Sequence, residues 1–450
     1  MQSSQFGKRN WWILVLFGLI GQIAWSVENM YFNLFVFETI DENLSAITLM
    51  VQLSGVAATV TTLVAGTLSD KTGDRRRYIS YGYIIWGFTV ALFGMLNVEG
   101  TKTLLGVDAQ RAVTWTLAAV IVGDCVMTLF GSTANDAAFN AWVTDNTREE
   151  FRGKVEGVLS VLPLIAMLIV AGGFGILVEA LGYKNLFLLL GVVISLCGVA
   201  GVFVIKDSPT LEKKGTLKDI FYGFKPSVVK ANPSLYLALC VMGVYGVACQ
   251  IFMPYLIIYM KTYLGFSVVE YSIVFGVAIV LGAAINIYLG GLTDRMDKTK
   301  TLYIAAAIFA VGLLGMYFAR FEGAFMTTLI LFGVAGFVMI TGYIFVSALC
   351  GAIVRDYTPI RDAGKLQGVR MIFSVLIPML IGPMIGNAIN AAMGNKLPDL
   401  AGNADAMTTQ YIPAPEIFLA GAIVAALLFA VIPLLRKYTA KRREKNEITD

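Results

Sequence analysis

The sequence contains no histidine and little charge. Charged residues make up 14% of its 450 residues and hydrophobic residues 57%, whereas globular domains carry roughly 25% charged residues. Without histidine, imidazole proton relays and zinc sites with histidine ligands are excluded. The net charge of +4 is small and spread along the chain, which argues against binding to nucleic acid. A mean hydropathy of +0.74 instead indicates a surface suited to lipid.

Cysteine is also scarce, and the chain has only five. Each lies inside an apolar run, without regular spacing, which predicts small core residues and no disulfide framework. No nucleophile–base pair, metal-ligand cluster or nucleotide-binding loop occurs. We therefore expect no enzyme activity, no cofactor and no metal. The cysteines are Cys125, Cys197, Cys240, Cys249 and Cys350.

Long apolar runs fill most of the chain. A bilayer core about 30 Å thick needs about 20 apolar residues per helix, and twelve runs are long enough. They lie at 11–38, 44–68, 78–97, 112–142, 154–180, 184–206, 234–262, 269–293, 300–319, 323–353, 364–392 and 415–438. This pattern predicts an all-α polytopic protein with twelve transmembrane helices in a lipid bilayer.

The distribution of lysine and arginine predicts the orientation. Most of the 34 cationic residues fall in alternate segments, beginning with the N-terminal one. Because positive charge stays on the cytoplasmic side, we expect both termini in the cytoplasm. The intervening loops hold only Lys102, Arg111, Lys184, Lys261, Arg320 and Lys396.

The two halves of the chain repeat each other. The segment VTDNTREEFRGKVEG, which begins at Val143, matches VRDYTPIRDAGKLQG, which begins at Val354. A second match aligns residues 66–76 with residues 290–300, each between the second and third predicted helices of its half. Each half has an even number of helices, so the repeat is parallel. Such repeats form two bundles around a central cavity.

The longest polar break, 207–233, separates six predicted helices from six others. The expected domains are six-helix bundles at 1–206 and 234–438, joined by this cytoplasmic linker, and a cytoplasmic tail at 439–450. Within the linker, LKDIFYGF is predicted to form a short amphipathic helix on the membrane surface. The break at 393–414 is predicted to be a flexible external loop.

The segment GTLSDKTGDRRR fits the loop signature G-x-x-x-D-[RK]-x-G-x-[RK]-[RK] at every fixed position. The chain therefore resembles the major facilitator superfamily. Within it, NDAAFNAWVTDNTREEFRGKVEG resembles the fourth helix and following loop of glycoside-pentoside-hexuronide cation symporters and sucrose transporters. The resemblance implies a monomeric secondary transporter of the inner membrane that moves a sugar or glycoside by alternating access. The alternative is an exporter of drug-like or lipid-like amphipathic compounds.

Ionisable side chains inside predicted helices are candidate functional residues, because charge within a bilayer is costly. Asp136 lies in the inner half of the fourth helix, with Asn140 one turn further on the same face. Together they can hydrogen-bond adjacent sugar hydroxyls. By resemblance, Asp136 matches the aspartate that melibiose-type symporters use at the sugar and cation site. The alternative is an aspartate that links neighbouring helices.

A second candidate group lies in the first helix. Glu28 is accompanied by Trp25, Asn29 and Asn33, and carboxylates, amides and aromatic faces suit carbohydrate recognition. The spacing of four places Asn29 and Asn33 on one face, with Trp25 and Glu28 on a neighbouring face. The alternative is a Glu28 side chain that reaches the outer surface.

Two other charged residues, Arg370 and Asp124, each have two possible environments. Arg370 is the one cation that lies away from the ends of a predicted span, and it either pairs with Glu28 or Asp136 across the cavity or reaches the cytoplasmic surface. Asp124 is expected to face another helix or the outer vestibule. Arg370 is therefore kept with the six binding-site candidates of the first half.

The loop after the second helix is expected to act in gating. Gly66 permits close helix approach, Asp70 can accept hydrogen bonds from a helix N-terminus, and the arginines can pair with acidic loop residues. The resemblance implies that Asp70 and its counterpart Asp294 help to lock the cytoplasmic side closed. The expected gating residues are Gly66, Asp70, Gly73, Arg75, Arg76, Asp294 and Arg295.

Proton coupling is favoured over sodium coupling. The melibiose-type branch has sodium-binding aspartates in the second helix, whereas the aligned stretch VAATVTTLVAG has only threonines. The aromatic residue expected one turn after the fourth-helix aspartate is replaced by Asn140. A carboxylate in a dry cavity can bind and release a proton, so Asp136 or Glu28 is expected to carry it.

Overall fold

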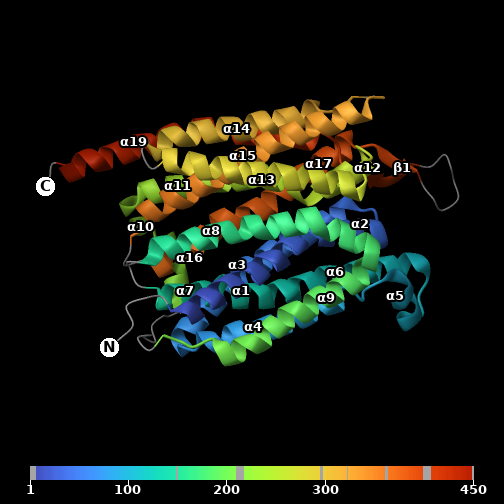
Figure 1. Ribbon diagram of the computed structural model, residues 1–450, viewed down its shortest axis with the longest axis horizontal. Helices are drawn as coiled ribbons and strands as arrows, with labels where there is room; N and C mark the ends of the chain where they lie inside the picture. Colours follow the sequence, from blue (N-terminus) through green and yellow to red (C-terminus); the bar gives the residue numbers. More distant parts are fainter. Residues whose placement is uncertain are drawn as a thin grey trace. The chain divides into compact units, whose positions relative to one another are not determined.

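The computed structural model describes residues 7–147, 151–208, 217–293, 297–321, 323–359, 363–398 and 407–447. The chain divides into two compact units, Met1–Asp219 and Ile220–Asp450. Their boundary falls within the polar segment 207–233. Figure 1 shows that both units consist almost entirely of helices.

The first unit is all helical in its described part. Side chains at the helix starts explain several boundaries: Asn43 accepts hydrogen bonds from the N–H groups of Ser45 and Ala46, and Asp108 accepts one from Arg111. Three short π-helices, η1, η2 and η4, interrupt the α-helices. The elements are α1 (Lys8–Val27), η1 (Glu28–Phe32), α2 (Asn33–Thr39), α3 (Leu44–Thr72), α4 (Arg75–Phe93), α5 (Val98–Leu105), α6 (Ala109–Gly131), η2 (Ser132–Phe139), α7 (Asn140–Asn146), α8 (Arg152–Ile169), η4 (Val170–Phe174) and α9 (Gly175–Val204).

The second unit adds a two-stranded antiparallel sheet to its helices. The 3-10 helix η5 (Leu217–Phe224) crosses the boundary between the units. The other elements are α10 (Pro226–Ala231), α11 (Pro233–Gln250), the 3-10 helix η6 (Met253–Tyr255), α12 (Leu256–Thr262), α13 (Val268–Thr293), α14 (Lys298–Phe318), α15 (Phe325–Tyr357), α16 (Ala363–Met371), the π-helix η8 (Ile372–Leu376), α17 (Ile377–Met393), β1 (Lys396–Pro398), β2 (Met407–Tyr411), α18 (Glu416–Ala426) and α19 (Leu428–Glu447).

The helices of the described residues are long and apolar enough to span a membrane many times. Ten qualify, or eleven if the bent pair α4 and α5 is one span. One of the ten, Gly157–Val204, has 48 residues, and a straight helix of that length would measure about 72 Å. The backbone at Gly182 leaves the helical region, with φ 74° and ψ 159°. If the two sides of Gly182 are separate spans, eleven becomes the predicted twelve.

Two polar segments have more regular structure than the sequence predicted. The expected external loop at 393–414 contains the hairpin β1–β2, in which Lys396 pairs with Tyr411. The buried amide oxygen of Asn390 accepts a hydrogen bond from the N–H of Ala414 at 2.9 Å, which ties this segment to α17. The loop prediction was therefore wrong for part of the segment. The predicted linker helix forms as η5, continued by α10.

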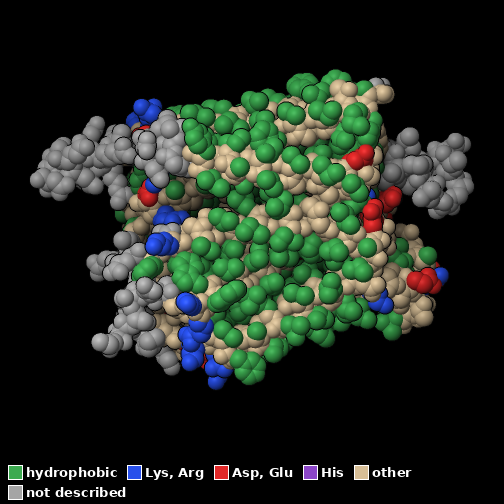
Figure 2. Space-filling view, in the orientation of Figure 1, with side chains coloured by type: hydrophobic (Ala, Val, Ile, Leu, Met, Phe, Trp, Pro, Cys, Tyr) green, Lys and Arg blue, Asp and Glu red, His purple; other side chains and the backbone are tan. Residues whose placement is uncertain are grey.

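Each unit presents apolar side chains on its surface. On α9, buried Phe187, Leu190 and Ile194 alternate with an exposed row. Figure 2 shows hydrophobic side chains spread along the helices, with charged side chains gathered near the helix ends. A water-soluble protein rarely exposes such a surface, so the molecule is an integral membrane protein. The exposed row consists of Leu188, Val192, Leu196 and Phe203.

Candidate functional site

A buried carboxylate lies within the first unit. Glu28 is 8% exposed, and its Oε1 accepts hydrogen bonds from Ser54 Oγ at 3.0 Å and Thr128 Oγ1 at 3.1 Å. The two hydroxyl oxygens are 2.8 Å apart. Ser54 belongs to α3 and Thr128 to α6. Three spans therefore meet at Glu28, an arrangement that the periodicity of a single helix could not reveal.

Asp124 joins this group from α6. It lies one turn before Thr128, is 2% exposed, and interacts with Ser54 and electrostatically with Glu28. It faces α3, another helix, which was one of its two expected environments. In the described part of the chain, no lysine or arginine pairs with Glu28 or Asp124. The signal that could have found this group is the i, i+4 spacing of Asp124 and Thr128.

Both membrane carboxylates of the predicted site lie in π-helical segments. Glu28 begins η1, and Asp136 lies within η2. π-Helices are rare in proteins overall, but those that occur are frequently found at functional sites. Asp136 is half-buried, accepts a hydrogen bond from Ser132 Oγ at 3.0 Å, and lies beside Trp25. It also acts electrostatically on Glu28, so Trp25, Glu28 and Asp136 form one neighbourhood.

The two asparagines of the first span lie one turn apart, and Asn33 donates from Nδ2 to the carbonyl of Asn29 at 2.9 Å. Their exposure differs, because Asn29 is exposed whereas Asn33 is 1% exposed. Asn140 is exposed and donates to the backbone carbonyl of Asp136 at 3.1 Å, leaving its amide oxygen accessible.

A hydrogen-bond chain fixes η2 against its neighbours. Asn135 Nδ2 donates to Tyr83 Oη at 2.7 Å, and the Tyr83 hydroxyl donates to the carbonyl of Phe17, also at 2.7 Å. A Cβ atom at Gly21 would lie 1.6 Å from Asn135 Nδ2, so α1 needs glycine there. These contacts hold α1, α4 and η2 together beside Asp136, the residue that follows Asn135 in η2.

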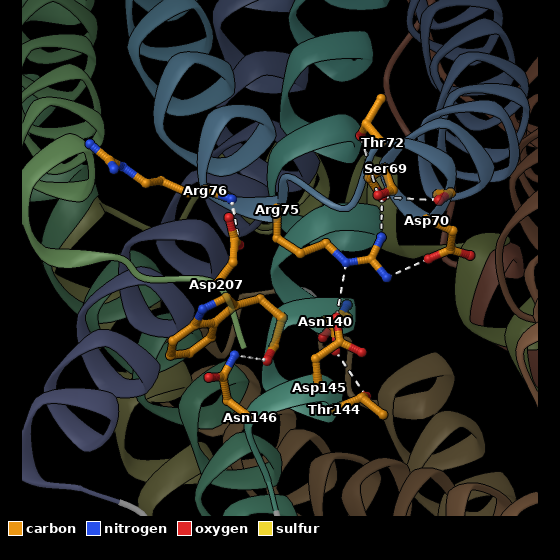
Figure 3. A network of polar contacts seen from close by, with 12 residues as sticks. Ser69, Asp70, Thr72, Arg75, Arg76, Asn140, Thr144, Asp145, Asn146 and Asp207 are labelled. Atoms are coloured by element: carbon orange, nitrogen blue, oxygen red, sulfur yellow. Dashed lines mark hydrogen bonds and ion pairs between the residues drawn. The ribbon is translucent and has the colours of Figure 1, made fainter. Parts of the chain in front are cut away.

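The predicted gating loop contains a buried arginine (Figure 3). Arg75, whose side chain is 5% exposed, forms ion pairs with Asp70 at the end of α3 and, at 3.0 Å, with Asp145 of α7. It also donates to Ser69 Oγ at 2.5 Å. A buried guanidinium needs such partners. Asp70 was expected to accept hydrogen bonds from a helix N-terminus. In the described part of the first unit, its partner is the Arg75 guanidinium instead.

Among the described residues, the Arg76 guanidinium forms no ion pair with an acidic side chain, in contrast to the prediction. Its guanidinium donates to the carbonyl of Val202. Its backbone N–H donates to the Asp207 carboxylate at 3.0 Å (Figure 3). Burial raises the pKa of Asp207, and the hydrogen bond from the Arg76 N–H opposes that shift. The loop is therefore fixed at α3, α7 and the end of α9.

The two glycines of the loop differ. Gly73 ends α3 in the left-handed region, with φ 66° and ψ 28°. A Cβ atom at Gly66 would meet only Ala137 Cβ, at 4.0 Å. The expected close approach at Gly66 is therefore not present within this unit, while Gly73 is required by its backbone conformation.

The second unit has a related ion pair. Lys298 at the start of α14 pairs with Asp356 near the end of α15 at 2.6 Å, and Asp297 caps α14 as Asp74 caps α4. The sequence alignment missed this pair, because it placed Arg75 against Thr299, one residue too far. The predicted gating residues Asp294 and Arg295 lie outside the described residues.

Arg370 belongs to α16, in the second unit, and its side chain is exposed. The two environments expected for it both remain predictions.

Comparison of the sequence with known proteins identifies the protein family to which the chain belongs. The sequence profile described as Major Facilitator Superfamily matches residues 11–350. A curated relative, a multi-drug resistance efflux pump PmrA homolog of Lactococcus lactis subsp. lactis (strain IL1403), is 22% identical over 317 residues. That match covers 67% of this chain and 75% of the relative.

Solved structures resemble the fold. A bacterial homolog of the human lysosomal transporter Spinster, inward-facing and unoccupied, has a TM-score of 0.67 at 14% identity, covering 98% of each chain. A mutant form of the nucleoside transporter NupG has a TM-score of 0.65 at 12% identity, covering 94% of this chain and 98% of that one. Identities this low show a shared fold.

Proposed function

Because the chain belongs to the major facilitator superfamily and is therefore a secondary transporter of a small molecule, we propose that it moves a sugar or glycoside by alternating access, coupled to protons. In this proposal it is a monomer of the inner membrane with both termini in the cytoplasm. The six-helix bundles 1–206 and 234–438 move about a central cavity, and 207–233 links them.

One observation carries the substrate class. The first and fourth spans carry an aromatic ring, a carboxylate and exposed amides. Trp25 of the first span lies beside Asp136 of the fourth. Asn29 is exposed one turn after Trp25, and Asn140 is exposed one turn after Asp136. Hydroxyl groups of a sugar can donate to the carboxylate and to both amide oxygens, while the sugar's apolar face packs on the indole. The resemblance of the fourth span to glycoside symporters supports the same class.

The two carboxylates take different roles in this proposal. Asp136 is half-buried and next to the exposed amides, so it contacts substrate. Glu28 is buried among hydroxyls, so it holds the coupling proton. Asn33 is buried and positions the first span, and Arg370 is retained as a candidate binding residue of the second half.

A second candidate function is export of drug-like or lipid-like amphipathic compounds. The similarity to a multi-drug efflux pump supports it. Export would require a mainly apolar binding surface, whereas the polar cluster described here offers several hydrogen-bonding groups. Sodium is the alternative coupling ion, but α3 contributes a serine and no carboxylate to the buried group.

The loop around Arg75 controls the exchange between states in this proposal. Its gating set is Gly66, Asp70, Gly73, Arg75 and Arg76, with Asp294 and Arg295 as the counterparts in the second half. An ion pair that forms in only one state shifts the equilibrium towards that state.

Two carboxylate variants in proteoliposomes test the assignment of roles, with a sugar or glycoside identified by thermal-shift screening as the substrate. Asp136→Asn should weaken uphill accumulation and exchange between equal pools together, because it removes a substrate contact. Glu28→Gln should abolish accumulation driven by a pH gradient yet keep exchange, because it mimics a permanently protonated carboxyl. Accumulation that persists in both variants and in the double variant would eliminate coupling through either residue.

A further inference from the structure

We propose that Glu28 and Asp124 together form the binding site of a single proton, framed by the hydroxyls of Ser54 and Thr128. The inference rests on the proposed function, because it locates the coupling proton of that transporter. It adds Asp124, Ser54 and Thr128 to the residues expected from the sequence. It also makes the coupling group a pair of carboxyls on two spans instead of one carboxyl.

Burial without a counter-charge is the first argument. Glu28 is 8% exposed and Asp124 is 2% exposed. Within the described residues, neither forms an ion pair with lysine or arginine. Two neighbouring carboxylates in a medium of low dielectric constant cannot both be ionised without a large cost. One cation must therefore be shared between them, and a proton is the smallest.

The unsatisfied oxygens are the second argument. Glu28 Oε1 receives two hydroxyl donors, but Glu28 Oε2 and Asp124 Oδ1 have no hydrogen-bond partner among the described residues. A buried acceptor without a donor destabilises the folded protein, because its desolvation is not compensated by a hydrogen bond. A proton on either oxygen supplies the missing donor. In the proposed site one proton, bound to one of these two oxygens and donated to the other, supplies the donor that both lack.

The frame favours exchange of the proton. Ser54 is bonded both to Glu28 and to Thr128, so its hydroxyl can reorient as the charge moves between the two carboxyls. The π-helix η1 begins at Glu28, where the helical hydrogen bonding is locally altered. The other titratable groups that act on the pair are Cys125, half-exposed beside Asp124 on α6, and Asp136 on η2.

Infrared spectroscopy of the purified full-length protein tests the site without any substrate. The C=O stretch of protonated buried carboxyls is followed as a function of pH. In the wild type we expect one such carboxyl from the pair. Asp124→Asn and Glu28→Gln should each move its titration midpoint to lower pH by about one unit or more, a tenfold loss of proton affinity, because the neighbouring negative charge is gone.

Variants of the frame should shift the midpoint in the opposite direction. Thr128→Val keeps the shape of the side chain but removes a donor to ionised Glu28, so the midpoint should move to higher pH. Thr128→Ser keeps the hydroxyl and should restore the wild-type midpoint. Glu99→Gln, at a side chain that is 79% exposed, is the control that should leave the band unchanged.

Three results would overturn the proposal. These are an unchanged midpoint in both carboxyl variants, a double variant that keeps the full intensity of the wild-type band, or loss of the band on adding sodium chloride but not potassium chloride at fixed pH. The last would identify a sodium site. If Asp124→Asn does not fold, the opposite shifts of Thr128→Val and Glu28→Gln decide. A band that behaves as expected in a protein that transports no sugar or glycoside would contradict the proposed function alone.

Discussion

At the residue scale, Gly66 and Gly73 belong to one loop signature but meet different constraints. Gly73 has a positive φ of 66°, and its N–H donates to the carbonyl of Ser69 at 3.0 Å. A residue with a side chain is strained there by about 1–2 kcal/mol. Gly66 lies within α3 and would meet Ala137 only at ordinary contact distance.

We expect Gly73→Ala to lower the stability of the purified protein by about 1–2 kcal/mol, the cost of a left-handed conformation for a residue with a side chain. Gly66→Ala should leave it unchanged or raise it slightly, because alanine favours a helix interior. Thermal unfolding in one detergent, at one protein concentration, compares the two variants directly. Equal destabilisation by both would show that Gly66 also has a close neighbour in the folded protein.

Asp70 is the exposed partner of the buried Arg75. In Asp70→Asn the arginine keeps Asp145 and Ser69, so the fold should persist. The balance between transport states should change, which slows transport several-fold while substrate affinity changes little. Asp74→Asn is the matched control, because asparagine caps α4 as well as aspartate does. Equal rates in wild type and Asp70→Asn would leave the loop without a gating role.

At the scale of the elements, α14 and α15 pack through glycine. A Cβ atom at Gly312 would lie 2.3 Å from the backbone nitrogen of Met339, and one at Gly342 would lie 2.3 Å from that of Phe309. Backbone atoms cannot move aside as a flexible side chain can. Close approach of these two spans therefore depends on the absence of side chains at both positions.

Gly312→Ala should destabilise the protein by about 1–3 kcal/mol, the range for overpacked cores. Gly336→Ala, on the same pair of helices, is the control, because nothing lies within 4 Å of its Cβ position. The melting temperature and the monodisperse fraction on size-exclusion chromatography compare the stability of the two variants. An unaltered Gly312→Ala protein would mean that α14 and α15 are farther apart than the structure shows.

The helices were largely predictable, but contacts between them were not. An apolar run of about 20 residues is stable in a bilayer as a helix, because a helix hydrogen-bonds all of its backbone groups internally. The helical membrane fold therefore follows from the length and composition of these runs. The grouping of Glu28, Ser54 and Asp124 does not, because it depends on which faces of three helices meet. The different exposure of Asn29 and Asn33 was not predictable either, because it depends on the helices packed around each residue.

At the scale of the whole molecule, the distribution of lysine and arginine predicts which side each loop occupies. In a background without native cysteines, a cysteine at exposed Ser227 or Lys300 should react with an impermeant reagent only from the cytoplasmic side. One at exposed Thr103 should react only from outside. Thr299 is unsuitable because it is 4% exposed. Labelling of all three positions from one side would contradict the predicted topology.

The activity that we propose for this protein is proton-coupled transport of a sugar or glycoside. Its most direct test is uptake by proteoliposomes that contain the purified protein, with a panel of radiolabelled sugars, glycosides and hydrophobic cations, with and without an imposed pH gradient. We expect at least one sugar or glycoside to accumulate against its gradient, and a protonophore to abolish this accumulation. Transport of hydrophobic cations alone, or accumulation that follows sodium and ignores the protonophore, would contradict it.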